Sequence, residues 1–356
     1  MMRFDVKASE TDAKVSEIGE SAFEGNYLLS KMNIEGTTDY GIIGKRAFYG
    51  SGLSSIGRDD VYFGGIWSHI GEEAFRSSSL SYFELKDIPG ISNIGKGAFS
   101  HTYIGNGLAG NMQNAVEIPE TVETIGENAF KCSGPFAIGR LKRVVFKGNS
   151  VRTIGAGAFE NNGLTSVILP EGLVSLGDAA FINNKLTTAD LSKTAITKIP
   201  ESAFENNLLT EVKLPSSIKT IGEYAFRNNK FGTITLGDGV TTVEEDAYRD
   251  NPLLKTASVG QSLKTLHRNA FYLNPNPSNR PKVKVNIRGG RNPNDLKDSD
   301  YHIVDPHKHV NLTFDDNGGT GGPGIIEVEK EKPIGALFPN EVRRSEERRV
   351  GKECRS

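Results

Sequence analysis

The chain has 356 residues, of which 37% are hydrophobic and 24% charged, and its formal net charge is −2. This balance argues against a strongly basic nucleic-acid-binding protein, and the presence of only 2 cysteines excludes a disulfide-rich scaffold. The sequence has no apolar run of about 18 residues, so no segment is predicted to span a membrane.

Residues 1–14 form a charged lead-in that begins Met1-Met2-Arg3-Phe4-Asp5 and lacks the apolar core of a signal peptide. We expect this start to belong to a truncated gene, because a secreted protein begins with an export signal. No sortase-type L-P-x-T-G sequence occurs either, which a missing C-terminus would explain.

Residues 15–275 carry one short motif, I-G-x-x-A-F or a close variant, eleven times. The copies end at Phe23, Phe48, Phe75, Phe99, Phe130, Phe159, Phe181, Phe204, Phe226, Tyr248 and Phe271. The steps between these aromatic residues range from 22 to 31 residues, and the last five steps are 22 or 23 residues. A unit of this length cannot bury its apolar side alone, so the period predicts a solenoid in which neighbouring units cover one another.

The rest of the unit is clearest in the regular half of the array. An Asn pair such as Asn161-Asn162 follows Phe159, Phe181, Phe204 and Phe226, and a run of the form L-x-x-V-x-L comes next. The alternation in this run predicts a short strand with one buried face, and the Pro, Ser or Gly after it predicts a turn. A lone aliphatic residue then precedes the next motif, at Leu173, Ala195, Ile218 and Val240. The Asn pair predicts a corner, because Asn tolerates left-handed backbone and its amides can ladder between stacked turns.

The aromatic position is predicted to be core, where a large ring packs beside the small Ala of the motif. In the regular half this core set is Phe159, Phe181, Phe204, Phe226, Tyr248 and Phe271. The side chains between the apolar strand positions are expected to stack into an exposed, Thr-rich face. These are Thr165, Ser166, Ile168, Thr187, Thr188, Asp190, Thr210, Glu211, Lys213, Thr233 and Thr235. Two interpretations of this face stay open, a solubilising β-surface or a broad, shallow ligand-binding face.

Residues 276–308 are predicted to be a C-terminal cap and linker. The segment from Val283 to Ile287 alternates like one last strand, which is what a solenoid needs to cover its terminal apolar face. His307 and His309 lie near Asp305 at the end of this segment, but no further spaced ligand accompanies them. We therefore interpret them as part of a solvated linker and not as a metal site.

Residues 309–342 begin a different unit. The segment from Val310 to Phe314 alternates like a strand, Asn317-Gly318 signals a hairpin, and a second strand is predicted at 325–331. Residues 343–356 have no periodicity and hold six basic and three acidic residues, so removing them changes the net charge from −2 to −5. This last stretch resembles a translated sequencing-adapter run, and we interpret it as a non-native tail.

The repeated I-G-x-x-A-F and L-x-x-V-x-L segments of residues 15–275 resemble the BspA-like, or treponemal-type, leucine-rich repeats of bacterial surface proteins. The resemblance implies a mainly β leucine-rich-repeat solenoid of about eleven repeats, with stacked short parallel strands, turns and short helical segments. It also implies a surface-exposed binding or adhesion module without catalytic chemistry. Many family members carry Cys just after the Phe, whereas this chain has the Asn pair there in the regular copies and Cys only at Cys132. Residues 309–342 resemble the start of a Listeria-Bacteroides, or internalin-B-like, repeat.

Motifs for catalysis or cofactor binding were sought separately. The sequence has no H-E-x-x-H, P-loop or C-x-x-C motif. Cys132 is interpreted as structural, residues 318–322 as a hairpin turn, and Trp67 as either a contact residue or part of the packing. We therefore predict no catalytic residue, no cofactor and no metal site.

These observations predict a non-enzymatic cell-surface protein that uses a repeat solenoid to bind host or partner macromolecules. Two alternatives stay open, a targeting module of a larger secreted cell-wall enzyme and an intracellular scaffold for protein interactions. The expected partner is a protein or a glycan and not a nucleic acid, and the expected state is a monomer. The expected location is extracellular, at the cell surface or attached to the cell wall.

Overall fold

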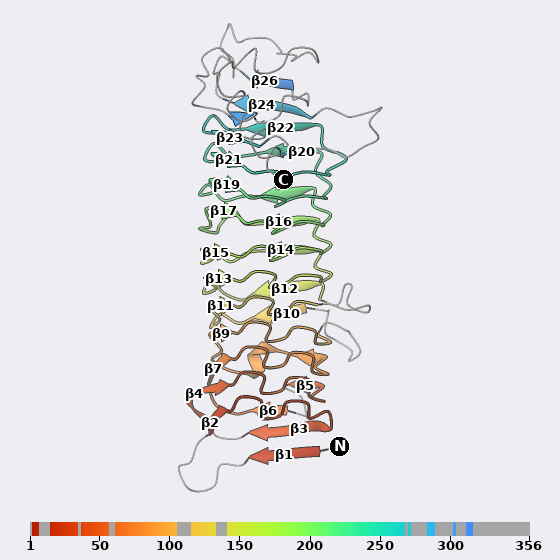
Figure 1. Ribbon diagram of the computed structural model, residues 1–356. Helices are drawn as coiled ribbons and strands as arrows, with labels where there is room; N and C mark the ends of the chain where they lie inside the picture. The colour runs from red at the N-terminus through yellow and green to blue at the C-terminus, as the bar shows by residue number, and fades with distance from the viewer. Residues whose placement is uncertain are drawn as a thin grey trace, which may run out of the picture. The chain divides into compact units, whose positions relative to one another are not determined.

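The computed structural model describes residues 2–6, 15–34, 37–56, 61–104, 115–132, 141–267, 270–271, 283–288, 302–303 and 311–315. The chain divides into two compact units, Met1–Pro215 and Ser216–Ser356, which are described separately below as unit 1 and unit 2. In each unit the repeats fold into short parallel strands joined by tight turns (Figure 1). This confirms the predicted mainly β solenoid.

In unit 1, one parallel sheet is built from the residues that precede the Gly of each I-G-x-x-A-F motif. Its seven strands are β2 (Val15–Ile18), β4 (Thr37–Ile43), β7 (Trp67–Ile70), β9 (Asn93–Ile94), β11 (Thr124–Ile125), β13 (Thr153–Ile154) and β15 (Ser175–Leu176). The next repeat places β17 (Lys198–Ile199) at the same position of its motif. Successive repeats supply neighbouring strands, because each repeat adds one strand to the edge that the previous repeat leaves.

The L-x-x-V-x-L runs supply strands on the other side of unit 1 (Figure 1). They pair in parallel as β10 (Ala115–Ile118) with β12 (Arg143–Phe146), and as β14 (Ser166–Ile168), β16 (Thr188–Asp190) and β18 (Glu211–Lys213). The inward side chains Val167 and Ala189 are only 3% and 2% exposed, as the alternation of the sequence predicts.

The first repeats of unit 1 are less regular. β1 (Met2–Val6), β3 (Leu29–Ile34) and β6 (Val61–Phe63) form one parallel ladder, while β5 (Ser55–Ile56) pairs with β8 (Tyr82–Phe83). The 27-residue repeat that ends at Phe75 therefore contributes two strands to this side, and they continue different ladders. A single 3-10 turn, η1 (Leu85–Asp87), follows β8 and is the helical element among the described residues.

Unit 2 repeats the same plan. β19 (Thr220–Ile221), β21 (Thr242–Val243), β23 (Thr265–Leu266) and β25 (His302–Ile303) pair in parallel in that order. β20 (Thr233–Thr235), β22 (Thr256–Val259), β24 (Lys284–Arg288) and β26 (Asn311–Asp315) form the second ladder, also parallel. The last strand predicted for the cap thus forms as β24, one residue later than expected.

The pairing of β26 differs from what the sequence analysis predicted for residues 309–342. Its residues were assigned to a hairpin module separate from the solenoid, but β26 pairs in parallel with β24 and continues the repeat ladder. The predicted hairpin partner at 325–331 and the tail at 343–356 lie outside the described residues.

The aromatic residues of the motif form a stacked column inside unit 1. Consecutive rings from Phe23 to Phe204 lie 5.0–5.4 Å apart between centroids, with interplanar angles of 1–11°. Phe159, Phe181 and Phe204 are each 0% exposed. The spacing of the rings matches the spacing of hydrogen-bonded strands, so one ring per repeat fills the interior.

A second aromatic column lies in unit 2. Phe226 stacks on Tyr248 at 5.0 Å, and Tyr248 stacks on Phe271 at 5.6 Å. Phe226 and Tyr248 are 0% exposed, while Phe271 is only half-buried. The Tyr248 hydroxyl has no hydrogen-bond partner among the described residues, and burial raises the pKa of this phenol.

Each regular repeat turns at two left-handed residues. One lies two positions after the aromatic residue, and there Asn161, Asn183 and Asn206 have φ of 59°, 57° and 56°. The other lies two positions before the aromatic residue, where Ala179 has φ of 54° and Ser202 has φ of 52°. Only the first of these positions was expected from the sequence, because Asn is the ordinary signal for left-handed backbone.

The Gly of the motif is required by close packing between turns. An added Cβ at Gly126 would lie 2.6 Å from the carbonyl carbon of Gly95 in the preceding turn. The amide N–H of Gly126 donates to the Ile94 carbonyl oxygen at 2.7 Å, which holds the two turns at this separation. A side chain at this position would therefore push successive turns apart.

The exposure of individual side chains decides two sequence interpretations, one for Ala195 and one for Trp67. Ala195 was assigned as an inward aliphatic residue, but it is exposed, and Ile196 is buried instead at 1% exposure. The repeat ending at Phe204 has 23 residues where the one before has 22, which shifts the inward position by one residue. Trp67 is 0% exposed and packs edge-on against Phe63 at 5.5 Å, so it is a packing residue and not a surface contact.

Candidate binding surfaces

The predicted Thr-rich face lies on the outer side of β14, β16 and β18 in unit 1. The residues Thr165, Ser166, Ile168, Thr187, Thr188, Thr210, Glu211 and Lys213 are exposed, and Asp190 is half-buried. Ile168 is 72% exposed and is a large apolar side chain within an otherwise polar face. In unit 2, Thr233 and Thr235 are exposed on β20, on either side of the buried Ile234.

The polar side chains of this face are held in place by neighbouring turns. The Thr187 hydroxyl donates to the Thr165 carbonyl oxygen at 3.2 Å, and the Thr210 hydroxyl donates to the Thr187 carbonyl oxygen at 3.4 Å. The Asp190 carboxylate accepts a hydrogen bond from the Ser192 hydroxyl at 2.6 Å and lies 3.5 Å from the Lys213 ammonium. The Ser192 donors hold the pKa of Asp190 below its ordinary value. The face is therefore ordered before any ligand binds.

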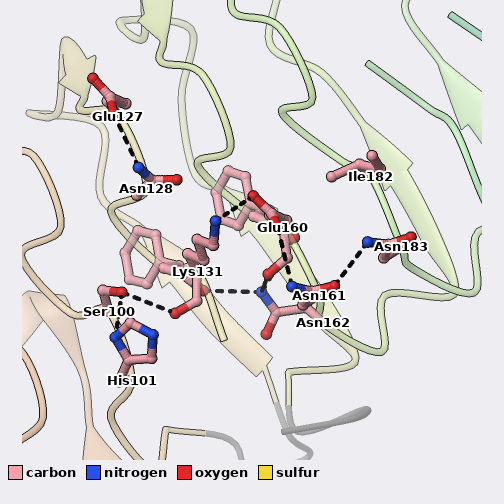
Figure 2. Close-up of polar contacts among 12 residues, drawn as sticks. Ser100, His101, Glu127, Asn128, Lys131, Glu160, Asn161, Asn162, Ile182 and Asn183 are labelled. Atoms are coloured by element: carbon pink, nitrogen blue, oxygen red, sulfur yellow. Dashed lines mark hydrogen bonds and ion pairs between the residues drawn. The ribbon is translucent and has the colours of Figure 1, made fainter. Parts of the chain in front are cut away.

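The Asn pairs form a second set of polar groups, at the corners after Phe159, Phe181 and Phe204, here called the downstream corners. The second Asn of each pair is buried, and Figure 2 shows the contacts of Asn162. Its side-chain nitrogen donates to the Phe130 carbonyl oxygen at 2.9 Å and to the Phe159 carbonyl oxygen at 3.2 Å. Asn184 and Asn207 repeat this arrangement one and two turns later. These amides join successive turns and are structural.

The first Asn of each pair forms an outer ladder. Asn183 donates to the Asn161 side-chain oxygen at 2.9 Å, and Asn206 donates to that of Asn183 at 2.8 Å. Figure 2 shows that the ladder begins at Glu160, which accepts from Asn161 at 3.1 Å and pairs with the Lys131 ammonium at 2.7 Å. The downstream corners thus present amides that already bind one another.

The corners after Phe23, Phe48, Phe75 and Phe99, here called the upstream corners, carry different side chains at the equivalent positions. Two residues after the aromatic residue stand Gly25, Gly50, Ser77 and His101, with φ from 56° to 67°. Four residues after it stand Tyr27, Gly52, Ser79 and Tyr103. Tyr27 is 78% exposed and Tyr103 is 44% exposed. Sequence reasoning did not single out this surface, although the change from Asn to Gly and Ser is visible in the repeat alignment.

The remaining candidates are Cys132 and the possible metal ligands. Cys132 is buried and forms no disulfide, and the cavity beside it has a volume of about 10 Å³, which is room for about one water molecule. The described residues contain no group of three potential metal ligands and no helix long and apolar enough to cross a membrane. Asp305, His307 and His309 lie outside the described residues, as do residues 318–322.

The stacked parallel strands, the buried aromatic column and the Asn corners together define a leucine-rich-repeat solenoid. The model of the BspA-type leucine-rich repeat region, which has six repeat copies, matches residues 4–131, 59–187, 134–255 and 197–279. The chain therefore belongs to the BspA-type leucine-rich repeat family. The match stops short of residues 309–342, so the internalin-B-like resemblance stays a prediction.

Solved structures that are similar to this chain come from several bacteria. A leucine-rich cell surface protein from Faecalibacterium prausnitzii shares 15% identity, with 78% of this chain and 88% of that chain covered and a TM-score of 0.35. The pneumococcal vaccine antigen PcpA shares 16% identity over 88% and 89% of the two chains, with a TM-score of 0.36. A leucine-rich repeat protein from Bacteroides ovatus shares 20% identity over 88% and 92%, with a TM-score of 0.37. The comparison with curated proteins gave no match.

Proposed function

We propose that this protein is a non-enzymatic bacterial cell-surface protein that binds or adheres to host or partner macromolecules through the outer face of β14, β16 and β18. Membership of the BspA-type family supports a binding module at the cell surface. The observation that carries the proposal is the order of this face, where hydroxyl and carboxylate side chains are fixed by adjacent turns before a ligand arrives. A face that is already ordered loses little conformational entropy on binding.

Ile168 is the anchor of the proposed contact. Its side chain is 72% exposed on a flat, otherwise polar strand face, and a large exposed apolar group of this kind gains most from burial in an interface. Asp190 and Lys213 lie on the neighbouring strands and supply opposite charges that would orient a partner.

Binding can be tested with the full chain against an immobilised panel of purified host extracellular-matrix and serum proteins. We expect saturable binding to at least one of them, and we expect Ile168→Asp to weaken that binding at least about tenfold, or about 1.4 kcal/mol. Val174→Asp is the matched control, because Val174 is also an exposed aliphatic residue, at 54%, but lies outside this face. Equal effects of the two substitutions, or no binding by the unmodified chain, would refute the assignment of this face.

The cellular location needs its own experiment. Mild protease treatment of intact cells that produce the protein should remove it if it lies at the surface. Retention of the whole pool inside protease-treated cells would contradict a surface role and favour an intracellular scaffold.

A further inference from the structure

We propose that the upstream corners of unit 1 form a second binding site, for a neutral oligosaccharide, between the exposed rings of Tyr27 and Tyr103. The inference extends the proposed function to another surface and ligand class, and it rests on that function only in treating the solenoid as a binding scaffold. The two tyrosines occupy the same position, four residues after the aromatic residue, in the first and fourth of four successive turns.

The distance between the two rings is set by the stack of turns. Phe23, Phe48, Phe75 and Phe99 follow one another in steps of 5.0–5.3 Å, so three such steps separate the turns of Tyr27 and Tyr103. Backbone hydrogen bonds join the turns at each step. Gly52 N–H donates to the Asn26 carbonyl oxygen and Ser79 N–H to the Ser51 carbonyl oxygen, each at 3.0 Å, and Tyr103 N–H donates to the Leu80 carbonyl oxygen at 2.8 Å, two residues further along the preceding turn than in the first two steps. The site is therefore a hydrogen-bonded corner with a tyrosine at each end.

The surface between the two tyrosine rings, here called the floor, is low because the residues that form it are small. Gly52 and Ser79 fill the same position in the two middle turns, and Gly50 and Ser77 lie two residues before them. At Gly52 an added Cβ would lie 2.1 Å from the Tyr27 carbonyl oxygen, so the backbone itself keeps a side chain out of this place. A ligand lying along the corner can thus touch the backbone while its ends meet the two tyrosines.

Free hydroxyl groups distinguish this floor from the downstream corners. Ser77 and Ser79 are exposed, and their hydroxyls have no hydrogen-bond partner among the described residues. At the downstream corners the equivalent amides of Asn161, Asn183 and Asn206 are bound to one another. A sugar needs donors and acceptors of this kind beside an apolar ring face, and serine and tyrosine together provide both.

The charges around the site favour a neutral ligand. Glu24, Arg46, Glu73 and Arg76 flank the corner, and they form ion pairs with one another. Burial, together with nearby Arg76 and Lys131, lowers the pKa of His101 below its ordinary value and so disfavours its charged form. Among the described residues, the strip between the tyrosines therefore has no unpaired charge with which to attract a nucleic acid or a sulfated or sialylated glycan.

The test uses the full chain and an array of immobilised neutral hexasaccharides, namely cello-, chito-, malto- and laminarihexaose, with sialylated and sulfated glycans as the charged arm. We expect binding to at least one neutral hexasaccharide and a loss of at least about tenfold in the double variant Tyr27→Ala/Tyr103→Ala. Tyr40→Ala is the matched control, because Tyr40 is 76% exposed on β4, away from the corner, and it should leave binding unchanged.

A second variant places a long side chain between the two tyrosines without removing an aromatic ring. Ser79→Lys should also weaken neutral-glycan binding at least about tenfold. This substitution is compatible with the fold, because Lys185 occupies the same position of a downstream turn and is exposed there. Unchanged thermal melting of both variants would show that the loss of binding is local.

The proposal is overturned if no neutral hexasaccharide binds, if only charged glycans bind, or if the tyrosine double variant behaves like Tyr40→Ala. It is also overturned if the double variant loses a protein partner while the unmodified chain binds no glycan. The Ile168→Asp substitution separates this outcome from failure of the proposed function. That substitution should weaken binding to the matrix or serum protein and leave neutral-glycan binding unchanged.

Discussion

The downstream and upstream corners of unit 1 differ in how their polar groups are hydrogen-bonded. Four residues after the ring, the Lys185 N–H donates to the Leu164 carbonyl oxygen downstream, whereas the Gly52 N–H donates to the Asn26 carbonyl oxygen upstream. Downstream, the side chain of Asn184 bonds to two backbone carbonyls and accepts the Leu164 N–H at 3.1 Å. Upstream, Ser51 and Ser78 occupy the equivalent position, are 1% and 0% exposed, and have hydroxyls without a partner among the described residues. A serine side chain is too short to reach the groups that an asparagine amide joins.

This difference shows that the packing of the aromatic column does not depend on how the corners are hydrogen-bonded. The rings stack at nearly the same spacing in both regions, so the interior does not require Asn corners. Both regions carry ion pairs on the surface, such as Lys45 with Glu72 at 3.2 Å upstream and Lys193 with Glu171 at 2.8 Å downstream. Exposed pairs of this kind contribute little, so we expect the upstream corners to be the less stable ones.

The largest expected loss of stability comes from removing a motif ring, and comparing this loss upstream and downstream tests whether the interior is equivalent in the two regions. Phe204→Ala and Phe75→Ala each remove a ring that is 0% exposed, and each should cost about 3–5 kcal/mol of unfolding free energy. Urea unfolding followed by circular dichroism measures both. A loss below about 1 kcal/mol for either would show that the ring is not part of a packed core.

The second largest expected change in stability comes from replacing a downstream Asn by the Ser that stands at the equivalent upstream position. Asn184→Ser should cost about 1–3 kcal/mol, because it leaves the Leu164 N–H without its acceptor and removes one of the two Asn donors from each of the Phe159 and Phe181 carbonyl oxygens. Lys185→Ser at the adjacent exposed position is the control and should change stability by less than about 0.5 kcal/mol. If the two variants unfold at the same urea concentration, the Asn amide does not fasten the turns.

The reverse substitution should stabilise the upstream region. Ser78→Asn places an amide where the buried hydroxyl has no partner, and we expect a gain of about 1 kcal/mol. The urea midpoint of this variant would rise if the corner accepts the amide. A fall of the midpoint would mean that the upstream corners are too narrow for Asn, and that their serines are set by space.

A smaller gain is expected at the left-handed residue before the aromatic ring. Ala179 has φ of 54°, whereas Gly157 fills the same position one turn earlier with φ of 59°. Ala179→Gly should therefore stabilise the chain by about 0.5–1 kcal/mol, since Gly adopts this backbone without strain. A thermal melt that shows a loss would indicate that the unfolded-state entropy of Gly outweighs the strain.

The smallest effect concerns the proposed ligand face. Ser192→Ala should raise the pKa of Asp190 toward its ordinary value, because the hydroxyl that stabilises the carboxylate is gone. In the unmodified chain this contribution to stability is present above the unfolded-state pKa and is lost as the pH falls through the lower folded-state pKa. Carboxyl chemical shifts of Asp190 measured against pH would detect the change, and an unmoved titration would remove Ser192 from the account.

Much of the fold follows from the sequence because one physical pattern is repeated. Phe159 and its equivalents recur at a fixed phase, and a period of 22–23 residues leaves room for only short strands and tight turns. The left-handed Asn161 was also predictable, because its residue type signals the conformation. The left-handed Ala179 and Ser202 were not, since neither residue favours that backbone and tertiary packing imposes it.

The strand pairing of the irregular first repeats could not be predicted from the sequence. Nothing in the sequence indicates that β5 and β6 continue different ladders, because both belong to one long repeat. The exposed tyrosines of the upstream corners were equally hidden, since their significance depends on which turns are neighbours. The binding role of the β14, β16 and β18 face remains a proposal, because exposure alone does not distinguish a solvated surface from a ligand site.

Site-resolved hydrogen exchange on the full chain tests most directly the claim that the downstream corners are closed and the upstream corners open. The amides of Leu164 and Leu186, which donate to Asn184 and Asn207, should exchange only with unfolding of the surrounding turns. The amides of Gly52 and Ser79 should exchange at least about tenfold faster, through local opening. Equal protection in the two regions, or slower exchange at Gly52 and Ser79, would contradict the account.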